Sequence, residues 1–169
     1  WGSAFDRITT FGAASFEHIG GTLVFNHGRQ HYEGWGDPGH SLTVRGFAPG
    51  SGGPHLFQVL AGNGAGPIET GITCGVKRLQ VIAESSGSIV AEGYVFMPHL
   101  GDWAEWRNSS FVSATLDASE TYRIGIDDDL RSINMSGFEH YTRYTAGSGG
   151  NAPFGRVNIA ELKVLRLVP

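Results

Sequence analysis

Charged residues and cysteine are both scarce in this chain. Asp, Glu, Lys and Arg make up 17% of its 169 residues, and the formal net charge is −4. This balance offers no basic face for nucleic acid or anionic lipid, so we expect neither as a partner. Cys74 is the single cysteine, which excludes a disulfide framework and a CxxC metal knuckle. No run of residues approaches the roughly 18 apolar residues of a membrane-spanning helix.

Glycine, unlike the charged residues, is abundant in this chain. The chain has 26 Gly and 7 Pro, a composition typical of many turns and unlike that of a helical bundle. Its length suits one ordinary domain, and no linker divides it. We therefore expect a single domain over residues 1–169.

Hydrophobic residues alternate with polar residues in several short segments. In Thr121–Ile126, for example, Tyr122, Ile124 and Ile126 share one face, which is the pattern of a half-buried strand. Glu84–Gly87 predicts a hairpin turn between two such segments. The predicted strands are Phe5–Thr9, Thr22–Asn26, Ser41–Phe47, Leu56–Ala61, Val76–Ala83, Ser88–Phe96, Ser110–Leu116, Thr121–Ile126 and a strand around Leu162–Val164. About ten short strands with Gly-rich turns predict an all-β, antiparallel β-sandwich. The segment Leu100–Arg107 could form one helical turn.

Motifs for common catalytic and metal chemistry are missing. No Gly-rich loop has the GxxxxGK[ST] pattern, and no Gly-x-Ser-x-Gly nucleophile elbow occurs. His27 and His31 lack a third metal ligand at an obvious spacing. Asp127–Asp129 follows a strand, so it is either a solvated turn or a loop that offers oxygen ligands to a hard cation such as Ca²⁺. Both interpretations stay open.

Aromatic residues cluster with polar ones at three places: His31–Asp37, Gly101–Asn108 and Phe138–Tyr144. A sugar ring has an apolar C–H face and a rim of hydroxyls, so its binding site needs an aromatic platform beside polar side chains. We expect about half of the rings to be structural, and Trp106 and Trp35 are the leading platforms. The side chains expected to contact sugar are His31, Tyr32, Trp35, Asp102, Trp103, Trp106, Tyr141, Arg143 and Tyr144.

The C-terminal half resembles a known family. Trp106 followed by Val112–Ile126 resembles the "W … v-L-aG-x-Y-x-i-x-i" passage of β-sandwich carbohydrate-binding modules, and Val157–Val164 is similar to their closing strand. Asn134–Ser136 and Tyr144–Gly150 resemble accessory domains of secreted bacterial polysaccharide-degrading enzymes. The resemblance covers residues 76–169 and implies a jelly-roll sandwich of the family 6 and 35 type.

The same resemblance implies roles for individual residues. It gives Trp106 the stacking role and assigns hydroxyl contacts to Asn151 or Asn158, and Asn134 is also expected to contact the sugar. Such modules often hold a structural Ca²⁺ through an acidic residue of the last strand, where this chain has Ala160. Glu161, with Asp6 as its partner, is the expected substitute. This departure from the family pattern puts the calcium site in doubt.

Three functions remain open from the sequence. The first is a non-catalytic module that binds an oligosaccharide or polysaccharide and belongs to a larger, secreted bacterial glycoside hydrolase or polysaccharide lyase. The second is a structural β-sandwich that packs against that parent catalytic domain through an apolar patch. The third is a small lyase or hydrolase that uses His31, Tyr32 or His140 with Arg143. No convincing acid–base pair of carboxylates supports the third, and nothing names the sugar.

Overall fold

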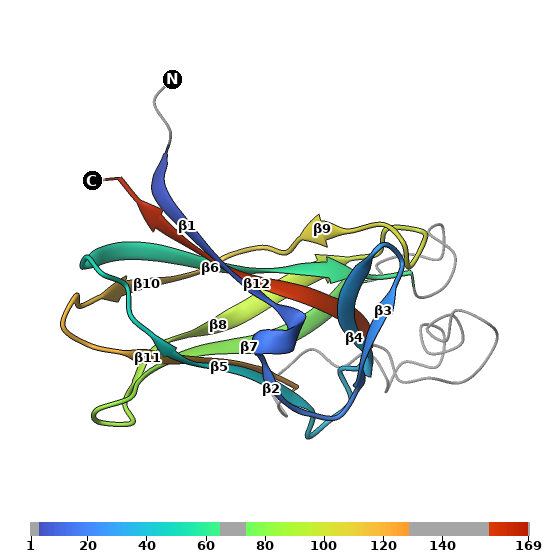
Figure 1. Ribbon diagram of the computed structural model, residues 1–169, viewed down its shortest axis with the longest axis horizontal. Coiled ribbons are helices and arrows are strands. Elements are labelled where there is room, and N and C mark those ends of the chain that lie inside the picture. Colours follow the sequence, from blue (N-terminus) through green and yellow to red (C-terminus); the bar gives the residue numbers. More distant parts are fainter. Residues whose placement is uncertain (1–3, 65–73, 129–155, 169) are drawn as a thin grey trace.

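The computed structural model describes residues 4–64, 74–128 and 156–168, which form two antiparallel β-sheets packed face to face (Figure 1). One sheet has seven strands. Its order is β10 (Val112–Leu116), β6 (Gly53–Gly62), β12 (Val157–Leu167), β4 (Arg29–Trp35) and β3 (Thr22–Asn26), with β1 (Phe5–Gly12) paired to β12 and β9 (Arg107–Asn108) paired to β6. The other sheet has the order β2 (Glu17–Ile19), β5 (Ser41–Phe47), β11 (Tyr122–Asp127), β7 (Cys74–Ala83) and β8 (Ile89–Pro98). A 3₁₀ turn, η1 (Ala13–Ser15), joins β1 to β2. The predicted all-β antiparallel sandwich is confirmed.

The alternation of the sequence explains how the strands face the core. On β11, Tyr122, Ile124 and Ile126 are buried, whereas the residues between them lie on the outer face of the five-stranded sheet. Such strands bury their apolar side chains against the facing sheet. The predicted hairpin between β7 and β8 is present, and Gly87 adopts a φ of 71° in its turn. That left-handed conformation favours glycine over residues with a Cβ.

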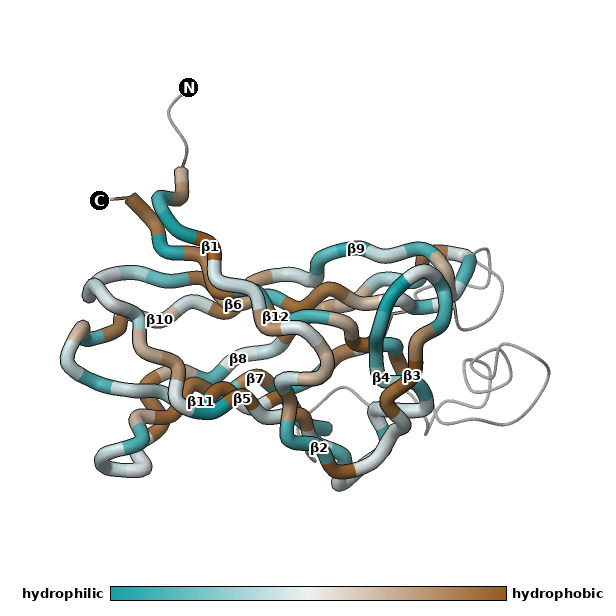
Figure 2. Tube along the Cα trace, in the orientation of Figure 1, coloured by the Kyte–Doolittle hydropathy of each residue, from teal (hydrophilic) through white to brown (hydrophobic). Residues whose placement is uncertain are grey.

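Apolar residues also occur on the edge of a sheet, as the brown segments of β3 in Figure 2 show. β3 is an edge strand of the seven-stranded sheet, and its Phe25 is 78% exposed. By contrast, the core between the sheets encloses large side chains of both layers, including Phe57, Leu79 and Leu162. Among the described residues, no helix is long and apolar enough to cross a membrane.

Three segments differ from the sequence prediction, and one of them is the short, unpredicted strand β2. Arg29–Trp35 is a strand, β4, which overlaps the aromatic cluster His31–Asp37 and was not among the predicted strands. The reason is that β4 lies between β3 and β12 and inserts Tyr32 and Trp35 into the core. The expected helical turn over Leu100–Arg107 is also wrong, because this segment forms non-helical turns that end in β9.

Candidate functional site

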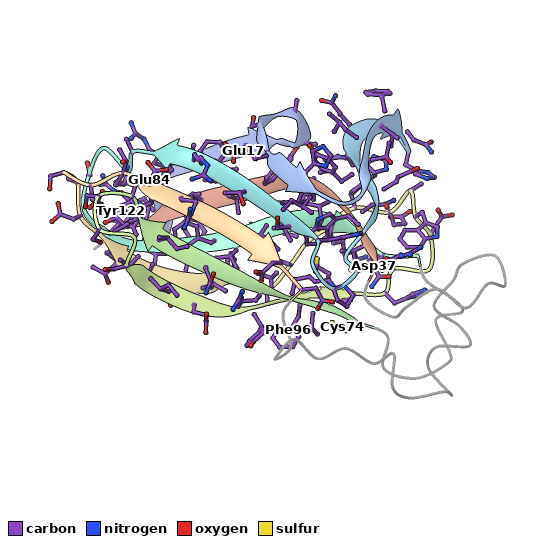
Figure 3. The ribbon with its side chains drawn as sticks, turned by 90° about the horizontal axis from the view of Figure 1, so that it is seen from below. Glu17, Asp37, Cys74, Glu84, Phe96 and Tyr122 are labelled. Atoms are coloured by element: carbon purple, nitrogen blue, oxygen red, sulfur yellow. The ribbon has the colours of Figure 1, made fainter. Side chains whose placement is uncertain are left out.

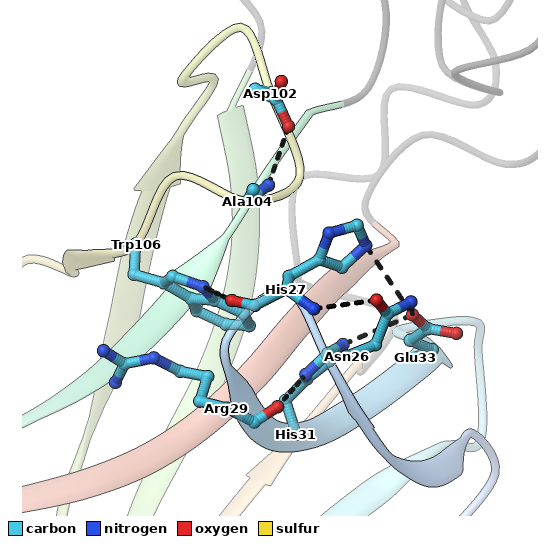
Figure 4. A network of polar contacts seen from close by, with 8 residues as sticks. All are labelled: Asn26, His27, Arg29, His31, Glu33, Asp102, Ala104 and Trp106. Carbon is cyan, nitrogen blue, oxygen red and sulfur yellow. Dashed lines mark hydrogen bonds and ion pairs between the residues drawn. The ribbon is translucent and has the colours of Figure 1, made fainter.

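Trp106 lies between β8 and β9, beside the tip of the β3–β4 hairpin (Figure 4). Its ring is only partly buried. The indole Nε1–H donates a hydrogen bond of 3.0 Å to the backbone carbonyl of His27. The ring also fits closely over β6, because a Cβ at Gly62 would come within 3.4 Å of the Trp106 ring. The indole is thus held in one orientation while part of its surface remains open to solvent.

Arg29 supplies a charged group next to this ring. Its guanidinium carbon lies 5.2 Å from the centroid of the Trp106 ring, within the range of a cation–π contact. The same guanidinium is 3.5 Å from the Glu161 carboxylate on β12. Further along β12, Lys163 donates to the side-chain oxygen of Asn108 at 3.1 Å. The neighbourhood of Trp106 therefore offers both donors and acceptors.

His31 supports Trp106 from within the protein. Its ring is fully buried and meets the Trp106 ring edge to face at a centroid distance of 4.9 Å. His31 Nδ1 is 3.0 Å from the carbonyl oxygen of Arg29, so this nitrogen carries a proton and donates. The other nitrogen, Nε2, lies 3.4 Å from the Glu33 carboxylate. Asn26 donates to the same carboxylate at 3.0 Å.

Trp103 and Asp102 lie on the same loop as Trp106. Trp103 packs closely on the chain at Gly64, where a Cβ would meet its backbone nitrogen at 2.5 Å. The ring of Trp103 is only partly buried. Asp102 is exposed and accepts a hydrogen bond of 2.8 Å from the Ala104 amide, which closes a local turn. The structure thus brings three of the predicted side chains to one surface loop.

Three other predicted sugar contacts are core residues. Trp35 is 0% exposed, Tyr32 1% and His31 0%. Tyr32 donates its hydroxyl proton to the Phe16 carbonyl at 3.5 Å, and burial raises the pKa of that hydroxyl. A stacking platform needs an exposed face, so the expectation that these three side chains contact sugar is wrong. Of the two leading platforms, Trp106 remains.

Five predicted contacts lie outside the described residues: Asn134, Tyr141, Arg143, Tyr144 and Asn151. His140, named for the lyase hypothesis, lies there as well. The alternative hydroxyl partner Asn158 is described, and it is 5% exposed on β12. These predictions stay untested.

The expected metal pair is not formed. Glu161 lies opposite Gly12 in the β1–β12 ladder, whereas Asp6 is six residues earlier on β1, a separation of roughly 20 Å at the usual rise per residue. Asp6 pairs with Arg166, and Glu161 lies between Arg29 and Lys163. These two carboxylates therefore cannot share a Ca²⁺ ion. Within residues 4–64, 74–128 and 156–168, no three His, Cys, Asp or Glu side chains are arranged to hold a metal.

The first two residues of the acidic triplet are engaged in ion pairs. Arg78 donates two hydrogen bonds, of 2.8 and 2.6 Å, to the Asp127 carboxylate. Asp128 is buried, and its carboxylate is 3.5 Å from Nζ of the equally buried Lys77. Desolvation lowers the pKa of Lys77, partly offset by Asp128. The first two side chains of the triplet therefore form neither a solvated turn nor an open cation site, and Asp129 is not described.

A further ion pair fixes the loop between β4 and β5. Arg156 donates two hydrogen bonds, of 2.8 and 2.7 Å, to the Asp37 carboxylate. These bonds hold the pKa of Asp37 below its usual value, although partial desolvation opposes them. Asp37 therefore serves to join β12 to this loop, which leaves it ill-suited as a catalytic acid.

No sequence motif marked the residues around Trp106. The β3–β4 hairpin places Arg29 beside the indole and brings Asn26 and Glu33 together next to His31, and the spacing of these residues carries no motif. Phe25, the most exposed aromatic side chain described, was assigned to a strand without any role. Its place in the alternating pattern of the strand Thr22–Asn26 is the signal that could have identified it as an apolar side chain on the outside of the sheet.

Comparisons with known proteins identify solved structures that share this architecture. No protein-family model matches the sequence, and the comparison with curated proteins yields no match. Solved structures do match. The C-terminal family 6 module of a laminarinase from Zobellia galactanivorans superposes with a TM-score of 0.60 at 15% identity, covering 95% of this chain and 100% of the module. A family 35 carbohydrate-binding module from Clostridium thermocellum gives a TM-score of 0.61 at 18% identity, covering 95% and 98%. This chain has the fold of carbohydrate-binding modules.

A match to a larger enzyme agrees with that fold. A Paenibacillus cycloisomaltooligosaccharide glucanotransferase, solved with cycloisomaltoheptaose, matches with a TM-score of 0.63 at 16% identity. The match covers 91% of this chain but only 18% of the enzyme. At these identities the likeness establishes the fold alone, and it confirms the architecture implied by the sequence resemblance.

Proposed function

We propose that the chain is a non-catalytic carbohydrate-binding module whose primary contact is Trp106. The observation that carries this proposal is the indole of Trp106, which is fixed by its hydrogen bond to His27 and partly open to solvent. A fixed aromatic surface binds the C–H face of a sugar without ordering a flexible side chain first. Arg29 lies against the indole, and Asp102 and Asn108 flank Trp106 in the chain, so these three side chains are the candidates for hydrogen bonds with hydroxyls.

The biological role would follow from weak, reversible binding. The module would be part of a secreted bacterial glycoside hydrolase or polysaccharide lyase, and it would hold the catalytic domain close to its polysaccharide. Linkage of this kind raises the effective concentration of enzyme at the substrate surface. The family 6 and family 35 modules that share this fold support the proposal. Stacking on few rings predicts micromolar to millimolar dissociation constants.

The experiment is affinity gel electrophoresis against a panel of soluble polysaccharides, followed by calorimetric titration with the best ligand. Wild type should be retarded by at least one glycan, and Trp106→Ala should lose that retardation. Phe25→Ala is the matched control, because Phe25 is a more exposed ring on the neighbouring hairpin. Loss of binding in Phe25→Ala with full binding in Trp106→Ala would overturn the assignment to Trp106. Absence of retardation by every glycan would overturn the function.

A catalytic role is tested with the same protein. Incubation with the bound glycan should release neither new reducing ends nor unsaturated uronates. Either product would show that the chain acts as a hydrolase or a lyase.

A further inference from the structure

His31 is buried although it lies on the outer side of the seven-stranded sheet. Side chains alternate along β4, so Arg29, His31 and Glu33 share one face, and Tyr32 between them packs in the core. His31 is nevertheless 0% exposed, because the rings of Trp106 and His27 pack against it at centroid distances of 4.9 and 5.9 Å (Figure 4). A titratable ring is thus enclosed beneath the indole.

One nitrogen of this ring has no hydrogen-bond partner. Nδ1 of His31 donates to the Arg29 carbonyl at 3.0 Å, so Nε2 of the neutral imidazole is an acceptor. Nε2 is buried and makes no hydrogen bond with any residue that the structure describes. It lies 3.4 Å from Oε1 of Glu33, which is also an acceptor. A proton on Nε2 would turn this contact between two acceptors into a charge-assisted hydrogen bond.

The β3–β4 hairpin holds the Glu33 carboxylate where it can receive that proton. Asn26 on β3 donates to Oε1 of Glu33 at 3.0 Å. Nε2 of His27, in the turn of the hairpin, is 3.9 Å from the same oxygen. The carboxylate is only half-buried, so it keeps its charge in contact with water, whereas His31 has no contact with solvent. Burial opposes a charge on His31, and the adjacent carboxylate favours it.

The remaining charges near His31 largely compensate each other. The Arg29 guanidinium, on the same face of β4, is 3.5 Å from the Glu161 carboxylate of β12. Lys163, also on β12, is 3.6 Å from that carboxylate. The β8–β9 loop places the uncharged indole of Trp106 against the ring. Among the described residues, Glu33 is therefore the group whose contact decides the charge of His31.

The same hairpin holds Trp106 at three points. The His27 carbonyl accepts the indole N–H at 3.0 Å, the His31 ring meets the indole edge to face, and the Arg29 guanidinium lies 5.2 Å from its centroid. All three groups belong to the turn of the hairpin and the first half of β4. A change in how His31 is bonded therefore acts directly on the orientation of Trp106.

We propose that His31 is a positioning residue for Trp106, and that a proton shared with Glu33 makes glycan binding stronger at pH 5 than at pH 8. This inference rests on the proposed function of Trp106. Histidine is the side chain whose charge ordinarily changes in this range. At low pH, the bond from Nε2 to Glu33 ties the hairpin beneath the indole, and an ordered platform loses less entropy when it binds. At higher pH the proton leaves and the two acceptors separate.

The first test uses the full chain without any glycan. Long-range ¹H–¹⁵N NMR of the histidine rings between pH 5 and 8 reports which nitrogens are protonated. Nδ1 of His31 should stay protonated throughout, and Nε2 should lose its proton within this range. The indole N–H signal of Trp106 should move with the same midpoint. A His31 ring that stays in one state, or an indole signal that does not follow it, would overturn the proposal.

The second test is calorimetric titration with laminarin and with dextran at pH 5 and pH 8. Both glucans are neutral, so any dependence on pH comes from the protein. The association constant should be about fivefold higher at pH 5. An equal or a higher constant at pH 8 would overturn the proposal. Failure of both glucans to bind at either pH counts against the glycan function, whereas the NMR measurement decides the coupling of His31 to Trp106 by itself.

Three variants make the assignment specific. Glu33→Gln removes the charge but offers an N–H donor to the neutral Nε2, so the ratio of association constants between pH 5 and 8 should fall to within twofold of unity. Glu17→Gln removes an equal charge from β2, in the other sheet (Figure 3), and should retain the fivefold ratio.

His27→Asn removes the second imidazole near Glu33, and asparagine tolerates the positive φ of 51° at this position. It should retain the ratio whatever its absolute affinity. Loss of the ratio in His27→Asn together with its retention in Glu33→Gln would mean that His27 carries the effect, and would overturn the assignment to His31.

Discussion

Trp106 and His27 are 79 positions apart in the chain, yet the indole N–H of Trp106 donates to the backbone carbonyl of His27 at 3.0 Å. This bond joins the β8–β9 loop to the tip of the β3–β4 hairpin. His27 itself adopts a φ of 51° there, which places its carbonyl in a tight turn. The orientation of the aromatic platform therefore depends on two segments that the sequence separates widely.

Trp106→Phe tests that dependence. The substitution keeps an aromatic ring but removes the donor, so we expect a loss of about 1 kcal/mol in unfolding free energy, the usual net value of one hydrogen bond. Glycan affinity should fall between wild type and Trp106→Ala, for which we expect a loss of roughly 1–3 kcal/mol of binding free energy. Urea denaturation and calorimetric titration measure the two quantities. Wild-type affinity in both variants would contradict the role of the ring.

Trp35→Ala tests whether Trp35 is a core residue and not a sugar-binding platform. Trp35 is completely buried, and its ring lies 5.9 Å from Nζ of Lys77. Truncation leaves a cavity, so we expect the unfolding free energy to drop by about 3–5 kcal/mol. Phe25→Ala, at an exposed position, should change it by no more than about 0.5 kcal/mol. Comparable, small changes in both variants would mean that Trp35 is not a core residue.

Much of the fold was predictable because its strands bury one face only. β5 has the predicted bounds, since polar and apolar residues alternate along it and turn residues flank it. The sequence analysis did not predict β4, because this strand has buried side chains on both of its faces. Tyr32 packs in the core, and His31 lies beneath Trp106. A strand buried on both faces loses the period-two pattern, and its aromatic residues then resemble those of a binding loop.

The sites were less predictable for a related reason. Composition singled out Trp106 as an aromatic ring among polar residues, yet nothing in the local sequence distinguishes it from the buried Trp35. Burial is decided by which strands lie opposite each other.

The Asp37–Arg156 pair predicts a pH dependence of stability. Because the hydrogen bonds from Arg156 lower the pKa of Asp37 in the folded state, the unfolded chain binds this proton more readily. The pair therefore stabilises the fold above the ordinary carboxyl pKa of about 3.9, and this contribution is lost as the pH falls through the lower folded-state pKa. Both side chains are partly exposed, so we expect Asp37→Asn to cost only about 1 kcal/mol at pH 7.

Urea denaturation of wild type and Asp37→Asn at pH 7, 5 and 3 measures this contribution. The difference between the two proteins should be largest at pH 7 and should shrink towards pH 3 and below. A difference that stays constant over this range would show that Asp37 acts through packing and not through its charge.

Lys77 and Asp128 form a buried ion pair, so the effect of replacing one on stability should depend on whether the other is present. Nζ of Lys77 also donates to the Gly36 carbonyl, and both charged side chains are almost fully buried. Removing one member takes this attraction away while the other charge stays buried, so Lys77→Met and Asp128→Asn should each destabilise the protein by about 3–5 kcal/mol. The double variant should lose markedly less than the sum of the two.

The titration of Lys77 gives an independent measurement of the same pair. Desolvation lowers the pKa of Lys77 in the folded state, so between that lowered value and the usual value of about 10.4 the unfolded chain binds more protons. The stability of wild type relative to Lys77→Met should therefore rise with pH in this alkaline window. Denaturation at pH 7, 8.5 and 10 follows this difference. A relative stability that falls with pH would mean that the attraction of Asp128 outweighs desolvation. In the double-variant experiment, additive effects of Lys77→Met and Asp128→Asn would show that the two charges do not interact.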